Sequence, residues 1–86
     1  MNRLFCISLG ILEVKGLISS GELPDLINTF YRLSEDRGAH ADYVGDGLFV
    51  AVKGEVKLSL MIGAFHEAIP SRLLFDVLEE LMDKAF

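Results

Sequence analysis

Residues 40–62 read H-A-D-Y-V-G-D-G-L-F-V-A-V-K-G-E-V-K-L-S-L-M-I, and this stretch decides the fold. It holds three segments of strand character, at residues 40–44, 48–52 and 56–62. Two short connections that contain glycine separate them, Gly45-Asp46-Gly47 and Lys53-Gly54-Glu55. Connections of this kind are typical of hairpins, so the stretch predicts an antiparallel meander of three strands.

Two further extended segments precede this meander. Residues 3–9, R-L-F-C-I-S-L, form an apolar run that predicts a buried strand, and residues 11–18 predict a second one. The two can pair as a hairpin. Gly10 and Gly16 are rival turn positions, however, and the sequence leaves the register open.

An amphipathic helix is predicted between the two sets of strands. Its apolar residues recur at helical spacing, and they are Leu23, Leu26, Ile27, Phe30 and Leu33. Ser19-Ser20-Gly21 offers capping chemistry, Pro24 suits a first helical turn, and Gly38 supplies a left-handed stop.

A second helix is predicted from Pro70 to the end of the chain. Its apolar stripe consists of Leu74, Val77, Leu78, Leu81, Met82 and Ala85. The element order β-β-α-β-β-β-α predicts an α+β fold over residues 1–86, with helices packed on a five-stranded, mainly antiparallel sheet. If the sheet is continuous, the first strand pairs with the last strand of the meander or lies at an edge.

Length and composition restrict the classes of protein. The chain has 86 residues, of which 51% are hydrophobic, so we expect one compact domain and no second one. A net charge of −5 disfavours nucleic acid and anionic lipid as ligands. No apolar stretch reaches the roughly 18 residues that span a bilayer, and no signal peptide is evident. We therefore expect a cytoplasmic protein, one that reaches membranes only through a partner.

Few residues suggest catalysis or metal binding. His40 lies near Asp42 and His66 near Glu67, but a metal site would need a third closely spaced ligand, so we interpret these as polar residues of loops and strand ends. Cys6, inside an apolar strand, is interpreted as a small core residue. No serine lies in a G-x-S-x-G motif. We predict no catalytic residue, no metal ligand and no cofactor.

One hairpin nevertheless suggests an enzyme as an alternative. Residues 43–52, Y-V-G-D-G-L-F-V-A-V, resemble the hairpin of class III nucleotide cyclases, which would make Asp46 a metal ligand. That family also needs an aspartate near the end of its first strand, and residues 7–10, I-S-L-G, contain none. A plain Asp-Gly hairpin turn explains the same residues.

A wider resemblance covers residues 4–86. Its densest part is residues 60–81, L-M-I-G-A-F-H-E-A-I-P-S-R-L-L-F-D-V-L-E-E-L, in which an apolar strand, an acidic loop and a helix follow in turn. This stretch and the element order resemble the longin domain, the amino-terminal module of certain vesicle SNAREs and related trafficking subunits. Phe75 and Leu78 fall on the phenylalanine and leucine of the family's "A-F-x-F-L-x-x-I" helix.

The longin resemblance implies a protein-interaction module without enzymatic activity, in membrane trafficking or small-GTPase regulation. Its partner would be a small GTPase, a SNARE-type helix or a trafficking-complex subunit, and a homo-oligomer is a further option. Longin domains usually continue into a third helix, whereas this chain stops at Phe86, so we do not expect SNARE function proper. A self-associating roadblock-type scaffold is another alternative, but it places a helix before the first strand, which residues 1–9 do not allow.

The expected contact strip runs along the first helix and the neighbouring short strand, where longin domains as a family receive partner segments. Because a chain of this length without a third helix should leave apolar surface uncovered, we predict that Phe30, Tyr31 and Tyr43 line this strip. Aromatic rings offer a large contact area, and tyrosine adds a polar tip. In the alternative interpretation Phe30 is a core residue and both tyrosines are ordinary surface residues.

Overall fold

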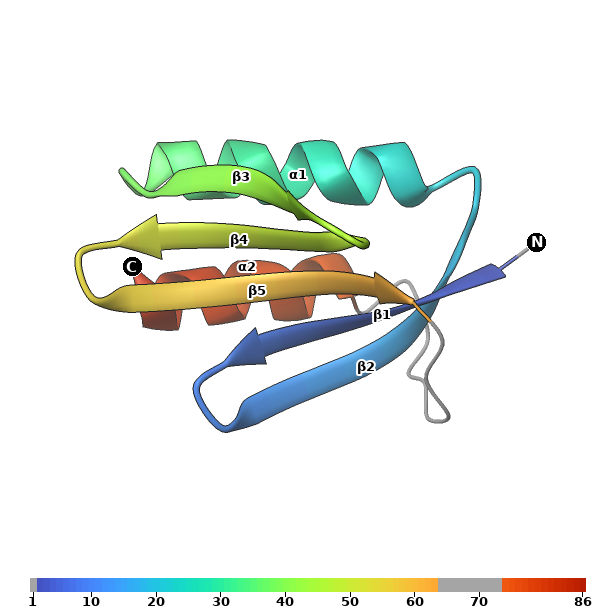
Figure 1. The fold of residues 1–86 in the computed structure, drawn as a ribbon, viewed down its shortest axis with the longest axis horizontal. Helices are drawn as coiled ribbons and strands as arrows, with labels where there is room; N and C mark the ends of the chain where they lie inside the picture. Colours follow the sequence, from blue (N-terminus) through green and yellow to red (C-terminus); the bar gives the residue numbers. More distant parts are fainter. Residues whose placement is uncertain (1, 64–73) are drawn as a thin grey trace.

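The computed structural model describes residues 2–63 and 74–86 of the chain (Figure 1). Its elements are, in order, β1 (Asn2–Leu9), β2 (Leu12–Ser19), α1 (Leu23–Asp36), β3 (His40–Gly45), β4 (Leu48–Lys53), β5 (Val56–Gly63) and α2 (Leu74–Ala85). This α+β fold has the five strands and two helices, in the same order, that the sequence predicts. The predicted helix start at Pro70 lies outside the described residues.

All five strands belong to one antiparallel sheet in the order β2-β1-β5-β4-β3. The meander β3-β4-β5 is confirmed, and β1 joins it by pairing with β5, so Cys6 lies opposite Met61. Of the two positions left open for the first strand, it therefore takes the pairing with the last strand of the meander. β2 and β3 form the two edges of the sheet.

The first hairpin turns at Gly10 and not at Gly16. Leu9 pairs with Leu12 across a two-residue connection, and Gly10 has a φ of 59°. A positive φ at this position suits glycine, because it lacks the Cβ that makes such a conformation unfavourable. Gly16 lies inside β2, buried and opposite Phe5. The choice of turn also sets which residues of β2 face the helices.

The start of α1 differs in detail from the prediction. The residue at the N-cap is Glu22, and its side chain makes no capping hydrogen bond. Ser19 does not cap the helix either, because its hydroxyl donates to a carboxylate oxygen of Glu22 at 3.0 Å. Pro24 lies in the first turn, as predicted, and Gly38, with a φ of 75°, follows the helix end.

Both helices pack on the same face of the sheet and on each other (Figure 1). A single cluster of buried side chains comes from both helices and from alternate positions of the strands; it includes Phe5, Ile7, Ile18, Leu26, Phe30, Leu33, Ala51, Leu58, Leu60, Ile62, Leu78, Leu81 and Met82. Helix α2 packs against β5, whose Leu58, Leu60 and Ile62 are buried. Val56 is an exception, since it lies at the start of β5 and is exposed.

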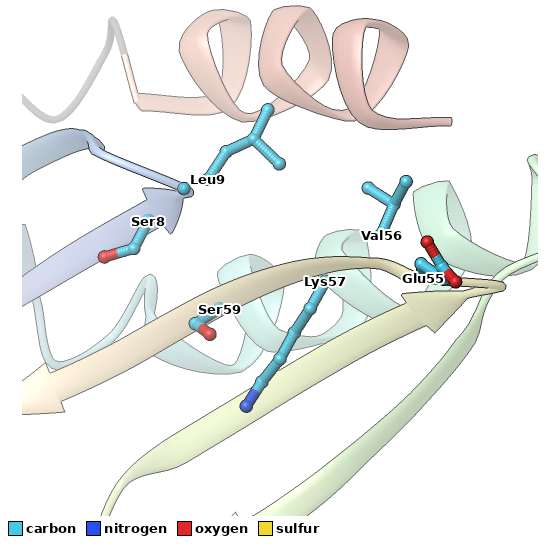
Figure 2. Close-up of a pocket in the computed structure, with 7 residues that line it drawn as sticks. Ser8, Leu9, Glu55, Val56, Lys57 and Ser59 are labelled. Atoms are coloured by element: carbon cyan, nitrogen blue, oxygen red, sulfur yellow. The ribbon is translucent and has the colours of Figure 1, made fainter.

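The opposite face of the sheet carries no described helix, and we call it the open face. Figure 2 shows the alternation at the ends of β1 and β5: Leu9 and Val56 point toward α2, and Ser8, Lys57 and Ser59 point away from it. By the same alternation the open face consists of Leu4, Cys6, Ser8, Glu13, Lys15, Leu17, His40, Asp42, Leu48, Val50, Val52, Lys57, Ser59 and Met61. Among the described residues, no helix has both the length and the apolar character required to cross a membrane.

Candidate functional site: an aromatic edge of the sheet

Four aromatic rings gather where α1 meets the β3 edge of the sheet. We call this group, Phe30, Tyr31, Tyr43 and Phe49, the aromatic edge. Two rings come from adjacent positions of α1, and the other two are direct cross-strand partners in β3 and β4. Phe49 is central, with its ring centroid 4.8 Å from that of Tyr43, 6.1 Å from Tyr31 and 6.5 Å from Phe30. These separations lie in the range favoured by interacting aromatic pairs.

Exposure divides the aromatic edge into an inner and an outer part. Phe30 is 0% exposed and belongs to the core, so it supports the ring of Tyr31 from inside at a centroid distance of 6.2 Å. Tyr31 and Phe49 are half-buried, and Tyr43 is 52% exposed. Of the three residues predicted to line a contact strip, the structure therefore leaves the two tyrosines accessible and buries Phe30.

Phe49 is the member of the aromatic edge that the sequence prediction missed. It lies within residues 48–52 of β4, which are all apolar, so no alternation marks which side chains face the helices. The turn at Gly45-Asp46-Gly47 was recognised, and pairing the strands across it would have placed Phe49 opposite Tyr43. The register of the β3–β4 hairpin is therefore the sequence signal that could have identified Phe49.

Backbone contacts hold Tyr43 in place. Its hydroxyl accepts a hydrogen bond from the backbone N–H of Gly47 at 3.1 Å, and its own N–H donates to the Asp42 carboxylate at 2.9 Å. Asp46 follows in the exposed turn with a φ of 54°. The accessible ring of Tyr43 is therefore held at its hydroxyl end, and the turn beside it carries the exposed carboxylate of Asp46.

β3 itself is an edge strand with several features that limit uncontrolled pairing. Within the described part of the chain it pairs with β4 alone, and it contains a register shift between Tyr43 and Gly45, which leaves Val44 62% exposed. His40 and Asp42 add polar side chains to this strand. Bulges and polar residues are common means of protecting an edge, while the free backbone groups still allow a specific partner to bind.

Of the two histidine–carboxylate pairs considered for metal binding, the first lies in the described part of the chain. His40 Nε2 lies 4.0 Å from a carboxylate oxygen of Asp42, with side-chain exposures of 85% and 71%. His66 and Glu67 lie outside the described residues. Within residues 2–63 and 74–86 there is no group of three or more His, Cys, Asp or Glu side chains placed to hold a metal ion.

A hollow lies at the end of the sheet that carries the turns β1–β2 and β4–β5 (Figure 2). This hollow has a volume of about 560 Å³ and is lined by Ser8, Leu9, Gly10, Glu55, Val56, Lys57 and Ser59. One wall is apolar, while the other carries hydroxyls and one charge of each sign. The lining contains no histidine or cysteine, and it does not bring together the nucleophile and base of a hydrolase.

Comparisons of the chain with protein-family models, with curated proteins and with solved structures return no significant match. The longin and cyclase resemblances therefore rest on the residues quoted above. Most of the helix in the longin-like stretch is described. Phe75 is partly buried against the core and Leu78 is fully buried, so both positions serve packing.

Proposed function

We propose that this protein is a protein-interaction module without enzymatic activity, and that the aromatic edge is where it binds its partner. The observation that carries the proposal is the ring of Tyr43, which is half exposed, packed on Phe49 at 4.8 Å and located on an edge strand. Rings that are already ordered before binding lose little conformational entropy on association. Residues of this type commonly dominate binding energies at interfaces.

The surroundings favour a partner segment that is apolar and basic. Tyr31 and Tyr43 both pack against the ring of Phe49, so an apolar side chain of the partner can contact this group of rings. The exposed carboxylate of Asp46 lies in the turn beside Tyr43, and the chain has a net charge of −5. We propose that a lysine or arginine of the partner faces this carboxylate, which would increase the association rate at low salt.

The longin resemblance supplies the partner classes. A SNARE-type helix, a small GTPase or a trafficking-complex subunit would bind at the aromatic edge in the cytoplasm. The protein would then meet membranes only through that partner. A homo-oligomer is the remaining option that the sequence raised.

Titration of isotope-labelled protein with a basic SNARE-type peptide, with a small GTPase in both nucleotide states and with a trafficking subunit tests the proposal. We expect amide shifts to concentrate on β3 and α1 for one of these partners. Tyr31→Ala and Tyr43→Ala should each weaken that binding by about 1–2 kcal/mol, or roughly five- to thirty-fold in Kd. Leu12→Ala is the matched control, because Leu12 is 49% exposed on the other edge strand. Shifts confined to β2 or to the open face would contradict the proposed site.

Tyr43 needs a second variant, because its hydroxyl also supports the turn. Tyr43→Phe removes the hydrogen bond from Gly47 and keeps the ring on Phe49. If the ring binds the partner, the phenylalanine variant should retain most of the affinity and the alanine variant should lose it. Equal losses in both variants would indicate that the turn is responsible and not the ring.

The enzymatic alternative has its own test. Incubation with ATP or GTP and Mg²⁺ or Mn²⁺ should yield no cyclic nucleotide, because the cyclase-like hairpin lacks the first-strand aspartate of that family. Formation of a cyclic nucleotide that disappears in Asp46→Asn would overturn the proposed function and favour the cyclase-like one.

A further inference from the structure

The open face has a composition that differs from both a core and an ordinary solvated surface. Its central strands carry Met61, which is 40% exposed, and Cys6, which is buried, next to Leu48 and Val50 of β4. A shallow hollow of about 350 Å³ lies on it, lined by Cys6, Ser8, Glu13, Lys15, Leu48, Ser59 and Met61. Apolar side chains that are concentrated on one uncovered face mark an interaction surface.

Strand register arranges these side chains in two adjacent rows across the sheet. The first row runs Lys15, Cys6, Met61 and Leu48 from β2 to β4. The second row runs Glu13, Ser8, Ser59 and Val50 over the same strands. Each row thus begins with one charge on β2 and ends with an aliphatic side chain on β4, and the two charges have opposite signs.

We propose that the open face is the interface of a symmetric dimer of this chain. The two copies stack with their open faces toward each other, and the two-fold axis lies in the plane between them. The axis runs perpendicular to the strands and passes between the two rows. It therefore places each row of one copy over the other row of the second copy. Glu13 then faces Lys15 of the second copy, and Lys15 faces its Glu13. Leu48 meets Val50 of the second copy in the same way. Self-complementarity of this kind is what a two-fold interface requires.

The charges also favour this axis over a two-fold axis that runs parallel to the strands. A two-fold axis parallel to the strands would lay β2 over β3 of the second copy, because these are the two edges of the sheet. Glu13 and Asp42 occupy the same row on those two strands, so like charges would meet. Like-charge contacts disfavour that arrangement. The perpendicular axis gives opposite charges and keeps the strands of the two sheets nearly aligned, as in β-sandwiches.

The dimer is independent of the proposed partner site. The aromatic edge lies on the helix side of the sheet, since Phe30 and Phe49 pack with the core, and the helices remain on the outside of the sandwich. With the perpendicular axis, β3 of one copy lies over β3 of the other. Both aromatic edges therefore stay accessible on the same side of the dimer.

Charge reversal tests the arrangement directly. Sedimentation equilibrium of the full chain from about 1 µM to about 1 mM should show a monomer–dimer equilibrium. Glu13→Lys alone and Lys15→Glu alone should each raise the dimer Kd at least tenfold, because each places like charges at both of the symmetric contacts between residues 13 and 15. An equimolar mixture of the two variants should recover dimerisation, since in the mixed dimer both contacts join opposite charges.

The experiment with the mixture distinguishes the loss of contacts between copies from changes within one chain. Glu13 and Lys15 are neighbours on β2, so a reversal also changes contacts within a copy, but mixing cannot repair those. Glu80→Lys is the matched control, because it makes the same charge change on the exposed side of α2. It should leave dimerisation unchanged, and in a mixture with Lys15→Glu it should form its own dimer without recruiting the Lys15→Glu chains.

Three results would overturn the proposal. The first is a monomer over the whole concentration range, which would mean that another occupant or solvent covers the open face. The second is a dimer that neither charge reversal weakens. The third is a mixture of the two variants that remains as dissociated as each variant alone, while thermal unfolding shows both to be folded.

Discussion

The two faces of the sheet are built from the same strands and differ completely in what they bury. On β5, Leu58 and Leu60 are fully buried beneath the helices, and Ser59 and Met61 between and beside them lie on the open face. The covered face is uniformly apolar at its centre, as a core must be. The open face mixes aliphatic side chains with ordered charges. A face of this mixed kind suits an association that is reversible, because each copy can also exist alone in water.

The contrast depends on the register of the strands. Because side chains alternate along a strand, a slip of one residue would exchange the two faces of β5. The uninterrupted pairing of β5 with both β1 and β4 ties this register to two neighbours. Sequence changes on the two faces should therefore have very different consequences, even at adjacent positions.

The largest expected effect comes from comparing Leu60→Ala with Met61→Ala. Leu60 is 0% exposed, so its truncation should lower the free energy of unfolding by about 2–5 kcal/mol. Met61, 40% exposed on the open face, should cost less than about 1 kcal/mol. Urea unfolding near 1 µM, where dissociated chains predominate, measures both. Equal losses in the free energy of unfolding would contradict the distinction between a covered and an open face.

How far the sequence predicts this molecule depends on whether alternation is visible. Residues 56–62 alternate clearly in the sequence, and Leu58, Leu60 and Ile62, which share one face by that pattern, are buried. Residues 48–52 are apolar throughout, so the sequence gives no sign that Phe49 faces the helices while Leu48 and Val50 face away. The missed member of the aromatic edge and two aliphatic residues of the open face, Leu48 and Val50, come from this one strand.

Other features were beyond the sequence for separate reasons. Gly10 and Gly16 have equal conformational freedom, and only the pairing of β1 with β2 distinguishes the turn from a strand position. Helical periodicity placed Phe30 on the apolar stripe of its helix, yet its location beneath Tyr31 depends on tertiary packing. Local patterns therefore fix which elements form, while the composition of a surface depends on how distant elements are brought together.

An intermediate effect is expected at the turns. Gly47 has a φ of 78°, and a Cβ there would collide with the carbonyl oxygen of Ile62, a residue whose side chain belongs to the covered face. Gly47→Ala should thus lower the free energy of unfolding by about 2–3 kcal/mol, from backbone strain and steric overlap together. Its own carbonyl accepts the N–H of Ile62 at 2.8 Å, so the backbone cannot move away freely.

Gly54→Ala is the control for this turn. Gly54 has a similar φ of 61°, but no atom lies within 4 Å of where its Cβ would be. Only the backbone term remains, so we expect about 1 kcal/mol. If Gly47→Ala and Gly54→Ala lower the free energy of unfolding equally, the steric contact at Gly47 has no effect on stability. The close packing of the covered side would then not include this turn.

The smallest effect should come from the ion pair at the rim of the covered side. Arg37 Nε donates to Asp83 Oδ1 at 2.9 Å and links the end of α1 to α2, with side-chain exposures of 18% for the arginine and 64% for the aspartate. Solvent screens such a pair, so Asp83→Asn should cost only about 0.2–1 kcal/mol. The cost should shrink further in 1 M salt, where the screening length falls to about 3 Å.

Glu79→Gln provides the reference, because Glu79 is an exposed carboxylate on the same helix. The difference between the two variants, measured by urea unfolding at low and high salt, isolates the interhelical pair. A cost for Asp83→Asn above about 2 kcal/mol would mean that charge holds α1 and α2 together, although their contact also includes buried Leu33 and Met82. A small, salt-dependent cost would instead indicate that apolar packing holds the two helices together. Charge pairs would then have their larger effect between copies, on the open face.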